Sequence, residues 1–185
     1  MNINNIFIVF TAYSFLGWCA EVAYQYWTQK KFINRGFLHG PFCPIYGACI
    51  LLVMYLFVYL LDKVHVNLFT LFIISTILIS FIEYITSYIL EKLFHLKWWD
   101  YTEDPLNLNG RICLHFSLGW GLAAMIVFKI IHPIIMDVIN LIPLETSRVI
   151  TIFIISYFVI DGVITLKKLI ITDSNNPFTK YFKKI

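Results

Sequence analysis

The sequence predicts an all-α integral membrane protein: a polytopic helical membrane bundle of five transmembrane helices, with the N-terminus outside and the C-terminus cytoplasmic. Hydrophobic residues make up 59% of its 185 residues and charged residues only 14%, which is too little polar surface for a soluble domain of this length. The apolar residues gather in five runs of roughly the 20 residues that a helix needs to cross a bilayer. Lys and Arg collect in alternate connections between these runs, as they do in multi-pass proteins.

The five predicted spans cover about residues 6–27, 43–61, 67–90, 112–131 and 149–168, and residues 169–185 form a basic cytoplasmic tail. We expect a single transmembrane domain, since no linker or low-complexity segment divides the chain. The N-terminal residues MNINNIFIVF contain no Lys or Arg, so the basic segment of a cleaved signal peptide is missing and the first span should be retained. The motif Gly40-Pro41-Phe42-Cys43-Pro44 leaves open a re-entrant segment at the start of the second span.

The positive charges predict the orientation. One side carries only Lys63, Lys129 and Arg148. The other side carries the remaining eleven of the fourteen, namely Lys30, Lys31, Arg35, Lys92, Lys97, Arg111, Lys167, Lys168, Lys180, Lys183 and Lys184. Cytoplasmic loops are enriched in Lys and Arg, so the first and third connections should face the cytoplasm of a multi-pass protein in the plasma membrane. The stretch HPIIMDVINLIPLE (132–145) then lies outside, as a short helix in the interface.

Carboxylates inside the predicted spans point to a polar pocket near the cytoplasmic side. Each costs roughly 2.5–3.5 kcal/mol at mid-helix, so it needs a partner or a water-filled cavity. Glu21, Glu83 and Asp161 fall at similar depth in the first, third and fifth spans. Polar residues also follow helical spacing, which places each set on one face directed to the bundle interior; the two sets are Ser14, Trp18, Glu21 and Gln25, and Ser80, Glu83, Ser87 and Glu91.

Arg35 and Arg111 precede the second and fourth spans, whose positive helix N-termini face the same side. Two guanidinium groups beside two helix N-termini are typical of an anion or phosphate site; alternatively, the arginines neutralise the nearby acids. The predicted substrate- or ion-binding residues are therefore Glu21, Arg35, Glu83, Glu91, Asp100 and Arg111. The predicted supporting residues are Asn34, Ser87, Trp99, Tyr101, Asn109, His115 and Asp161. The sequence assigns no catalytic residue.

Other kinds of site have weaker support. The cysteines Cys19, Cys43, Cys49 and Cys113 form no CxxC pair, so we interpret them as reduced packing residues. No metal-ligand spacing such as HExxH occurs, so we expect no metal site and name no cofactor. The net charge of +3 does not indicate a nucleic-acid partner. Residues 35–39 and 111–115 share the pattern R-x-x-L-H, which is either a short internal repeat or chance.

Five segments carry a resemblance to a known family. They are SFLGWCAEVAY (14–24), NRGFLHGPFCPIYG (34–47), EYITSYILEKLF (83–94), KWWDYTEDPLNLNGRICLHFSLGWG (97–121) and HP (132–133). With them the chain resembles the small bacterial integral membrane proteins named putative ABC-transporter type IV, or permease-like, proteins. The resemblance implies a membrane subunit that works with an ATP-binding partner. The chain itself lacks the G-x-x-x-x-G-K-[ST] motif, and its size implies a homo-oligomer or a partner subunit.

Three functions follow as hypotheses. The first is a permease-like transport component whose cytoplasmic loops bind an ATP-binding subunit. The second is an intramembrane enzyme that acts on a phosphate-bearing lipid at the inner leaflet, with a carboxylate as general base. The third is a lipid-binding or scaffold protein whose basic tail binds anionic headgroups. Whether the protein is an enzyme is left open, and membrane lipids are partners in all three.

Overall fold

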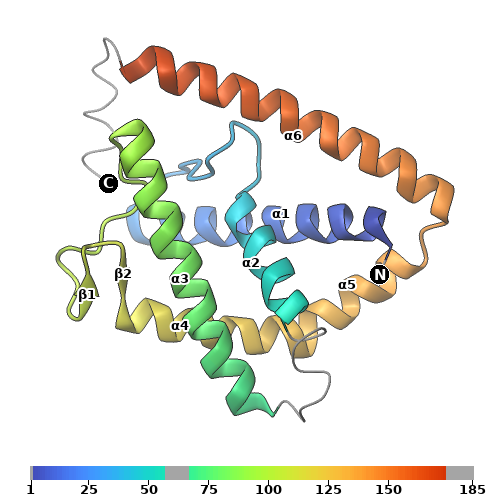
Figure 1. The fold of residues 1–185 in the computed structure, drawn as a ribbon, viewed down its shortest axis with the longest axis horizontal. Coiled ribbons are helices and arrows are strands. Elements are labelled where there is room, and N and C mark those ends of the chain that lie inside the picture. The colour runs from blue at the N-terminus through green and yellow to red at the C-terminus, as the bar shows by residue number, and fades with distance from the viewer. Residues whose placement is uncertain (1, 57–66, 174–185) are drawn as a thin grey trace. The chain divides into compact units, whose positions relative to one another are not determined.

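The computed structural model describes residues 2–56 and 67–173 of the chain. Its helices are α1 (Ile3–Gln29), α2 (Pro44–Tyr55), α3 (Leu68–Phe94), α4 (Leu114–Ile126), α5 (His132–Asn140) and α6 (Leu144–Asp173), and a π-helical turn, η2 (Val127–Ile131), precedes α5 (Figure 1). The loop before α4 contains a two-stranded antiparallel ribbon of β1 (Asn107–Leu108) and β2 (Ile112–Cys113). The predicted all-α class is confirmed.

Among the described residues, four helical stretches are long and apolar enough to cross a membrane: Ile3–Gln29, Leu68–Phe94, Leu114–Asn140 and Leu144–Leu169. They match the predicted first, third, fourth and fifth spans, so the chain is a multi-pass membrane protein. The predicted second span, 43–61, begins as the 12-residue apolar helix α2 and ends among residues 57–66, outside the described part. The end of the predicted tail, 174–185, also lies outside it. The count of five spans and the orientation remain predictions.

The long helices carry their largest apolar side chains on the outside. Trp27 of α1 is 77% exposed and Phe153 of α6 is 72% exposed. Many of the buried positions are small or polar instead, as with Ser14 and Gly17 in α1. This distribution suits a helix in lipid, since large side chains can face acyl chains at no cost while small residues allow close helix contact.

The buried face of α3 matches the prediction from helical spacing. Ser80, Glu83 and Ser87 are all buried, and Glu91 on the same face is partly exposed. Ser80 and Thr76 place hydroxyl oxygens in the interior that have no hydrogen-bond partner among the described residues. An otherwise apolar helix thus presents one polar face to its neighbours.

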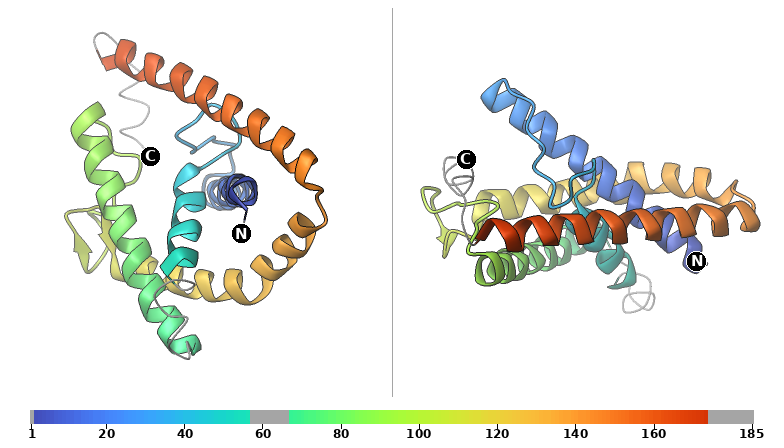
Figure 2. Two further views of the ribbon diagram at one scale, coloured as in Figure 1. Left: turned by 45° about the vertical axis from the view of Figure 1, so that its right-hand side comes forward. Right: turned by 90° about the horizontal axis from the view of Figure 1, so that it is seen from above.

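The chain divides into two compact units, residues 1–55 with 130–166 and residues 56–129 with 167–185. The first contains the helix pair α1–α2, and the second contains the pair α3–α4 (Figure 2). Both pairs begin with a 27-residue helix capped by an asparagine side chain, Asn2 or Asn67. Both of these helices end at a residue in the left-handed region, Lys30 or His95, whose N–H donates to the carbonyl four residues earlier.

A glycine of the second helix packs on corresponding positions in each pair. Gly47 of α2 lies against Phe10 and Ser14 of α1, and Gly121 of α4 lies against Phe72 and Thr76 of α3. A shift of 62 residues relates Phe10 to Phe72 and Ser14 to Thr76. The same shift relates Glu21 to Glu83. The two helix pairs therefore share a packing plan and the position of an acidic side chain, which supports an internal repeat.

Candidate functional site

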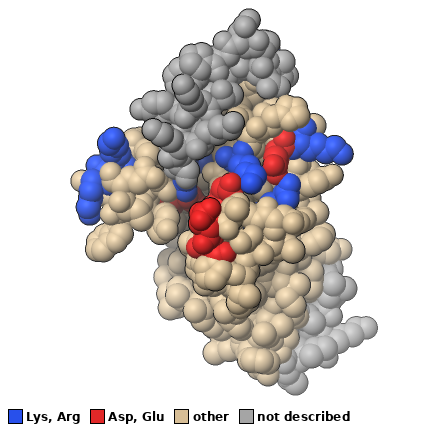
Figure 3. All heavy atoms as spheres, turned by 90° about the vertical axis from the view of Figure 1, so that its left-hand side faces the viewer, with Lys and Arg blue, Asp and Glu red and all other residues tan. Residues whose placement is uncertain are grey.

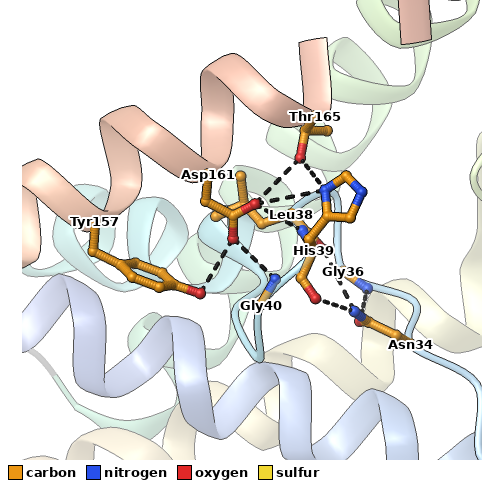
Figure 4. Close-up of polar contacts among 8 residues, drawn as sticks. All are labelled: Asn34, Gly36, Leu38, His39, Gly40, Tyr157, Asp161 and Thr165. Atoms are coloured by element: carbon orange, nitrogen blue, oxygen red, sulfur yellow. Dashed lines mark hydrogen bonds and ion pairs between the residues drawn. The ribbon is translucent and has the colours of Figure 1, made fainter. Parts of the chain in front are cut away.

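In the first unit, Asp161 of α6 binds the loop between α1 and α2 (Figure 4). The backbone N–H of His39 donates to Oδ1 at 3.0 Å, and that of Gly40 donates to Oδ2 at 2.9 Å. The Tyr157 hydroxyl donates to Oδ2 at 3.2 Å, and the Thr165 hydroxyl donates to Oδ1 at 3.4 Å. Four donors surround the carboxylate, which is how a buried charge is stabilised away from water.

The local sequence of α6 explains this arrangement. Tyr157, Asp161 and Thr165 are spaced four residues apart, so they share one face of the helix. Gly40 packs so tightly on this face that a Cβ atom there would collide with the Tyr157 hydroxyl. The His39 ring completes the contact, with Nδ1 at 2.9 Å from the Thr165 hydroxyl and 3.6 Å from Asp161 Oδ1. Asp161 was predicted as a supporting residue, whereas its partners on α6 were missed; their four-residue spacing was the available signal.

Asn34 fixes the same loop from its other end. Its side-chain oxygen accepts from the backbone N–H of Gly36 at 3.0 Å and from the indole N–H of Trp18 at 2.9 Å. Its amide nitrogen donates to the carbonyl of His39 at 2.8 Å (Figure 4). The predicted supporting residue Asn34 thus links the loop to α1.

Glu21 and Arg35, both predicted to bind substrate or ion, also lie in the first unit. The Tyr46 hydroxyl of α2 donates to Glu21 Oε1 at 2.6 Å, and Gly17 allows the Tyr46 ring to lie directly against α1. The side-chain amide of the buried Gln25 satisfies its hydrogen bonds when its oxygen faces Arg35. In that orientation the oxygen accepts from Arg35 Nη1 at 2.7 Å and from Nε at 3.2 Å. The guanidinium of Arg35 therefore binds a neutral amide, and Glu21 binds a phenol.

In the second unit, Glu83 of α3 is only 7% exposed. The hydroxyl of Tyr101, from the loop that precedes α4, donates to Glu83 Oε1 at 3.1 Å. The Tyr101 ring packs on Phe116, with ring centroids 5.0 Å apart. This loop thus reaches a carboxylate in the buried face of a membrane helix.

Arg111 pairs with the end of α3, which agrees with the alternative that the arginines neutralise nearby acids. Its Nη2 lies 2.5 Å from Glu91 Oε2, and the guanidinium lies over the rings of Tyr84 and Tyr88, 5.6 Å from each centroid. Asn109 donates to the Tyr84 hydroxyl at 2.8 Å. The carboxylate neutralises the arginine, and the two aromatic faces add cation–π attraction.

Asp100 organises the turn of the same loop. It accepts from the backbone N–H and the hydroxyl of Thr102 and from Lys97 Nζ at 3.1 Å. Burial raises the pKa of Asp100, but the hydrogen bonds from Thr102 and Lys97 lower it by more, so the pKa lies below its usual value. Gly110 has φ +67° and lies against Asp100 and Thr102, a position that only glycine occupies without strain.

The remaining predicted residues also belong to the second unit. The indole N–H of Trp99 donates to the carbonyl of Arg111 at 2.9 Å, and Ser87 is buried in α3. His115, at the start of α4, lies between Asp104 and Cys113. Acidic and basic side chains stand next to one another on the face drawn in Figure 3, in keeping with the ion pairs Lys97–Asp100 and Arg111–Glu91.

The six predicted binding residues therefore fall into two groups. Glu21 and Arg35 belong to the first unit, and Glu83, Glu91, Asp100 and Arg111 belong to the second. A single pocket formed by all six stays a prediction. Within the first unit, the structure also has an apolar hollow of about 170 Å³, lined by Ile6, Phe7, Phe10, Leu51, Ile154 and Phe158.

The family model described as "Putative ABC-transporter type IV" matches residues 8–166. The match covers all of the residues described in this subsection except Ile6 and Phe7 of the apolar hollow. No solved structure matches the chain. Because the match extends over most of the 185 residues, the chain belongs to this family of ABC-transporter-type membrane proteins.

Proposed function

We propose, on the basis of this family membership, that the protein is the permease-like membrane component of a transporter in the bacterial plasma membrane. An ATP-binding subunit would bind the two loops predicted to face the cytoplasm, because this chain lacks a nucleotide-binding motif. The observation that carries the proposal is the hydrogen bond from Tyr101 to Glu83. It joins such a loop directly to a buried carboxylate in a membrane-crossing helix.

The energetic cost of placing the Glu83 carboxylate in a membrane helix argues that this residue has a function. An acidic side chain in a membrane helix destabilises insertion by roughly 2.5–3.5 kcal/mol, and apolar replacements commonly stabilise such positions equally well. Intramembrane carboxylates are typical of ion and substrate pathways. Glu21 occupies the corresponding position in the first helix pair and also accepts a bond from a tyrosine. We therefore propose Glu21 and Glu83 as the groups that bind a polar substrate or a coupling ion.

The two arginines have different roles in this proposal. Arg111 is neutralised by Glu91 and lies over the rings of two tyrosines of α3, so its role is to hold the loop against α3. Arg35 contacts an uncharged amide and keeps its net charge for an anionic group. A phosphate clamp built from both arginines, as the lipid-enzyme hypothesis requires, has less support than a transport function.

The first experiment is a gentle purification in nanodiscs from native membranes, with mass spectrometry of every co-purifying protein and lipid. We expect an ATP-binding subunit at a fixed ratio, together with membrane lipids and a second copy of this chain. A tightly bound phosphate-bearing lipid without any ATP-binding subunit would contradict the proposal. Turnover of such a lipid without ATP by the purified protein would establish the enzyme instead.

Variants test the Tyr101–Glu83 contact itself. Tyr101→Phe removes the hydroxyl but keeps the ring on Phe116, and Glu83→Gln removes the charge at nearly constant volume. Both should leave folded protein in the membrane and lower substrate-stimulated ATP hydrolysis of the reconstituted complex at least about tenfold, the scale expected for a lost charge-assisted hydrogen bond. Tyr26→Phe, at an exposed position of α1, is the matched control and should hydrolyse ATP normally.

A further inference from the structure

We propose that Asp104, Cys113 and His115 form a binding site for a transition-metal-type divalent cation, with Zn²⁺ the best match. One ligand atom from each residue lies within 4.8 Å of the other two. The ligands are a carboxylate oxygen, a sulfur and an imidazole nitrogen, a mixed set that suits a cation of intermediate softness. The site lies within the second unit and is independent of the transport proposal.

The separations are close to those of tetrahedral coordination. Zn–S bonds of about 2.3 Å and Zn–N or Zn–O bonds of about 2.0 Å place sulfur and nitrogen about 3.5 Å apart, and nitrogen and oxygen about 3.3 Å apart. In the structure, Cys113 Sγ lies 3.9 Å from His115 Nε2 and 3.6 Å from Nδ1. Asp104 Oδ1 lies 3.6 Å from Nε2. With Nε2 as the ligand, both separations must shorten by a few tenths of an ångström, and the imidazole ring must turn, because its Nδ1 lies nearer the sulfur than Nε2 does. The sulfur and the carboxylate oxygen lie within 4.8 Å of each other and must also move closer together.

The backbone around the three residues is already fixed. Cys113 is the N-cap of α4 and pairs with Asn107 in the β-ribbon. The N–H of Asp104 donates to the carbonyl of Tyr101 at 2.9 Å, and Asn107 Nδ2 donates to the carbonyl of Asp104 at 2.8 Å. The His115 ring packs against Phe116 in a tilted arrangement, with centroids 4.4 Å apart and an interplanar angle of 40°. Such supporting bonds orient metal ligands before the metal arrives.

The exposure of the three residues suits reversible binding of a cation. Cys113 is 2% exposed, whereas half of the His115 side chain and a third of that of Asp104 are open to solvent. The sulfur thus lies at the base of the site and the other two ligands form its open side. Three protein ligands leave a fourth position for water or another group. A bound cation would link the part of the loop that carries Tyr101 and Asp104 to the ribbon and to the start of α4.

The test uses the full-length protein in detergent or nanodiscs, stripped of metal with a chelator. Zn²⁺ is titrated in competition with a chromogenic chelator, and Co²⁺ is added to a parallel sample. We expect one Zn²⁺ per chain and a thiolate-to-Co²⁺ charge-transfer band. Cys113→Ser and His115→Phe should each weaken Zn²⁺ binding at least about tenfold, and Cys113→Ser should abolish the Co²⁺ band.

Cys19→Ser in α1 is the matched control, because Cys19 is a free cysteine outside the cluster; it should bind as the unchanged protein does. Thermal unfolding of each variant without metal checks that it folds. The absence of stoichiometric binding would overturn the proposal. So would Zn²⁺ affinity and a Co²⁺ band that are the same in Cys113→Ser as in the unchanged protein.

Discussion

Gly40 and Gly162 of the first unit form a matched pair for substitution by alanine, because they differ in the space available for a Cβ atom. At Gly40, a Cβ would meet the Tyr157 hydroxyl and the Asp161 carboxylate, whereas at Gly162, the neighbour of Asp161 in α6, it would meet nothing within 4 Å. Gly40→Ala should therefore lower the free energy of unfolding by about 1–3 kcal/mol, the usual cost of overpacking. Gly162→Ala should be neutral or stabilise by up to about 1 kcal/mol, since alanine favours helix.

Thermal unfolding in detergent measures both variants. Hydrogen exchange at His39 and Gly40 locates the effect, because their N–H groups donate to Asp161. Faster exchange in Gly40→Ala alone is the expected result. Equal losses of stability in both variants would contradict the tight contact between the loop and α6.

The lowered pKa of Asp100 predicts that the stability of the loop before α4 depends on pH. Its pKa is lowered in the folded protein, so its ionised form stabilises the loop above the unfolded value of about 3.9. That contribution is lost as the pH falls through the folded pKa. The Asp100 side chain is 46% exposed, so solvent screening keeps the effect small. Asp100→Asn should lower the melting temperature near neutral pH and converge with the unchanged protein in acid; a difference that does not vary with pH would contradict this.

At the scale of elements, Gly121 determines how closely α4 approaches α3. A Cβ at this position would meet Thr76 and the Phe72 ring, whereas Gly119 on the same helix has nothing within 4 Å. Gly121→Ala should reduce stability by about 1–3 kcal/mol, and Gly119→Ala should have little effect. Thermal unfolding in the same detergent compares the two. A stable Gly121→Ala protein would show that the helices separate at little cost.

The starts and ends of helices were predictable from the sequence where hydrophobicity alone determines them. The starts and ends of α1 and α3 fall within a few residues of the predicted first and third spans. The fourth span was predicted to end at residue 131 and to be followed by a separate short helix within 132–145, but one helical stretch runs from Leu114 to Asn140. Pro133 normally marks a boundary, because it lacks an N–H and clashes with the preceding turn. Here the π-turn Val127–Ile131 precedes it and changes the hydrogen bonding, so the helix resumes as α5.

Contacts between distant parts of the sequence were predictable only in part. The sequence offered the pairing of the arginines with nearby acids as one of two interpretations, and the structure has the ion pair between Arg111 and Glu91. The sequence could not reveal that Asp161 binds backbone N–H groups, since every residue except proline carries one and leaves no signature in the sequence. Nor could it reveal the grouping of Asp104, Cys113 and His115. A short two-stranded ribbon brings these residues together, and their spacing in the sequence matches no known ligand motif.

At the scale of the whole molecule, the number of spans decides which sides of the membrane the two polar loops face. The described part of α2 has 12 residues, about 18 Å of helix, which is shorter than the roughly 30 Å hydrocarbon core. If the chain from Pro44 to Asn67 crosses, α1 and α3 run in the same direction and both loops lie on one side. If it turns back, the loops lie on opposite sides.

Single-cysteine labelling distinguishes these topologies. In a variant whose four native cysteines are replaced by serine or alanine, Lys31→Cys, Lys97→Cys and Arg148→Cys are treated one at a time with a membrane-impermeant maleimide. The excess of Lys and Arg in both loops predicts that Lys31→Cys and Lys97→Cys react only after the cells are permeabilised and that Arg148→Cys reacts in intact cells. Opposite behaviour of Lys31→Cys and Lys97→Cys would make α2 re-entrant. An ATP-binding subunit could then contact only one of the two loops, and the corresponding acids Glu21 and Glu83 would belong to helices of opposite direction.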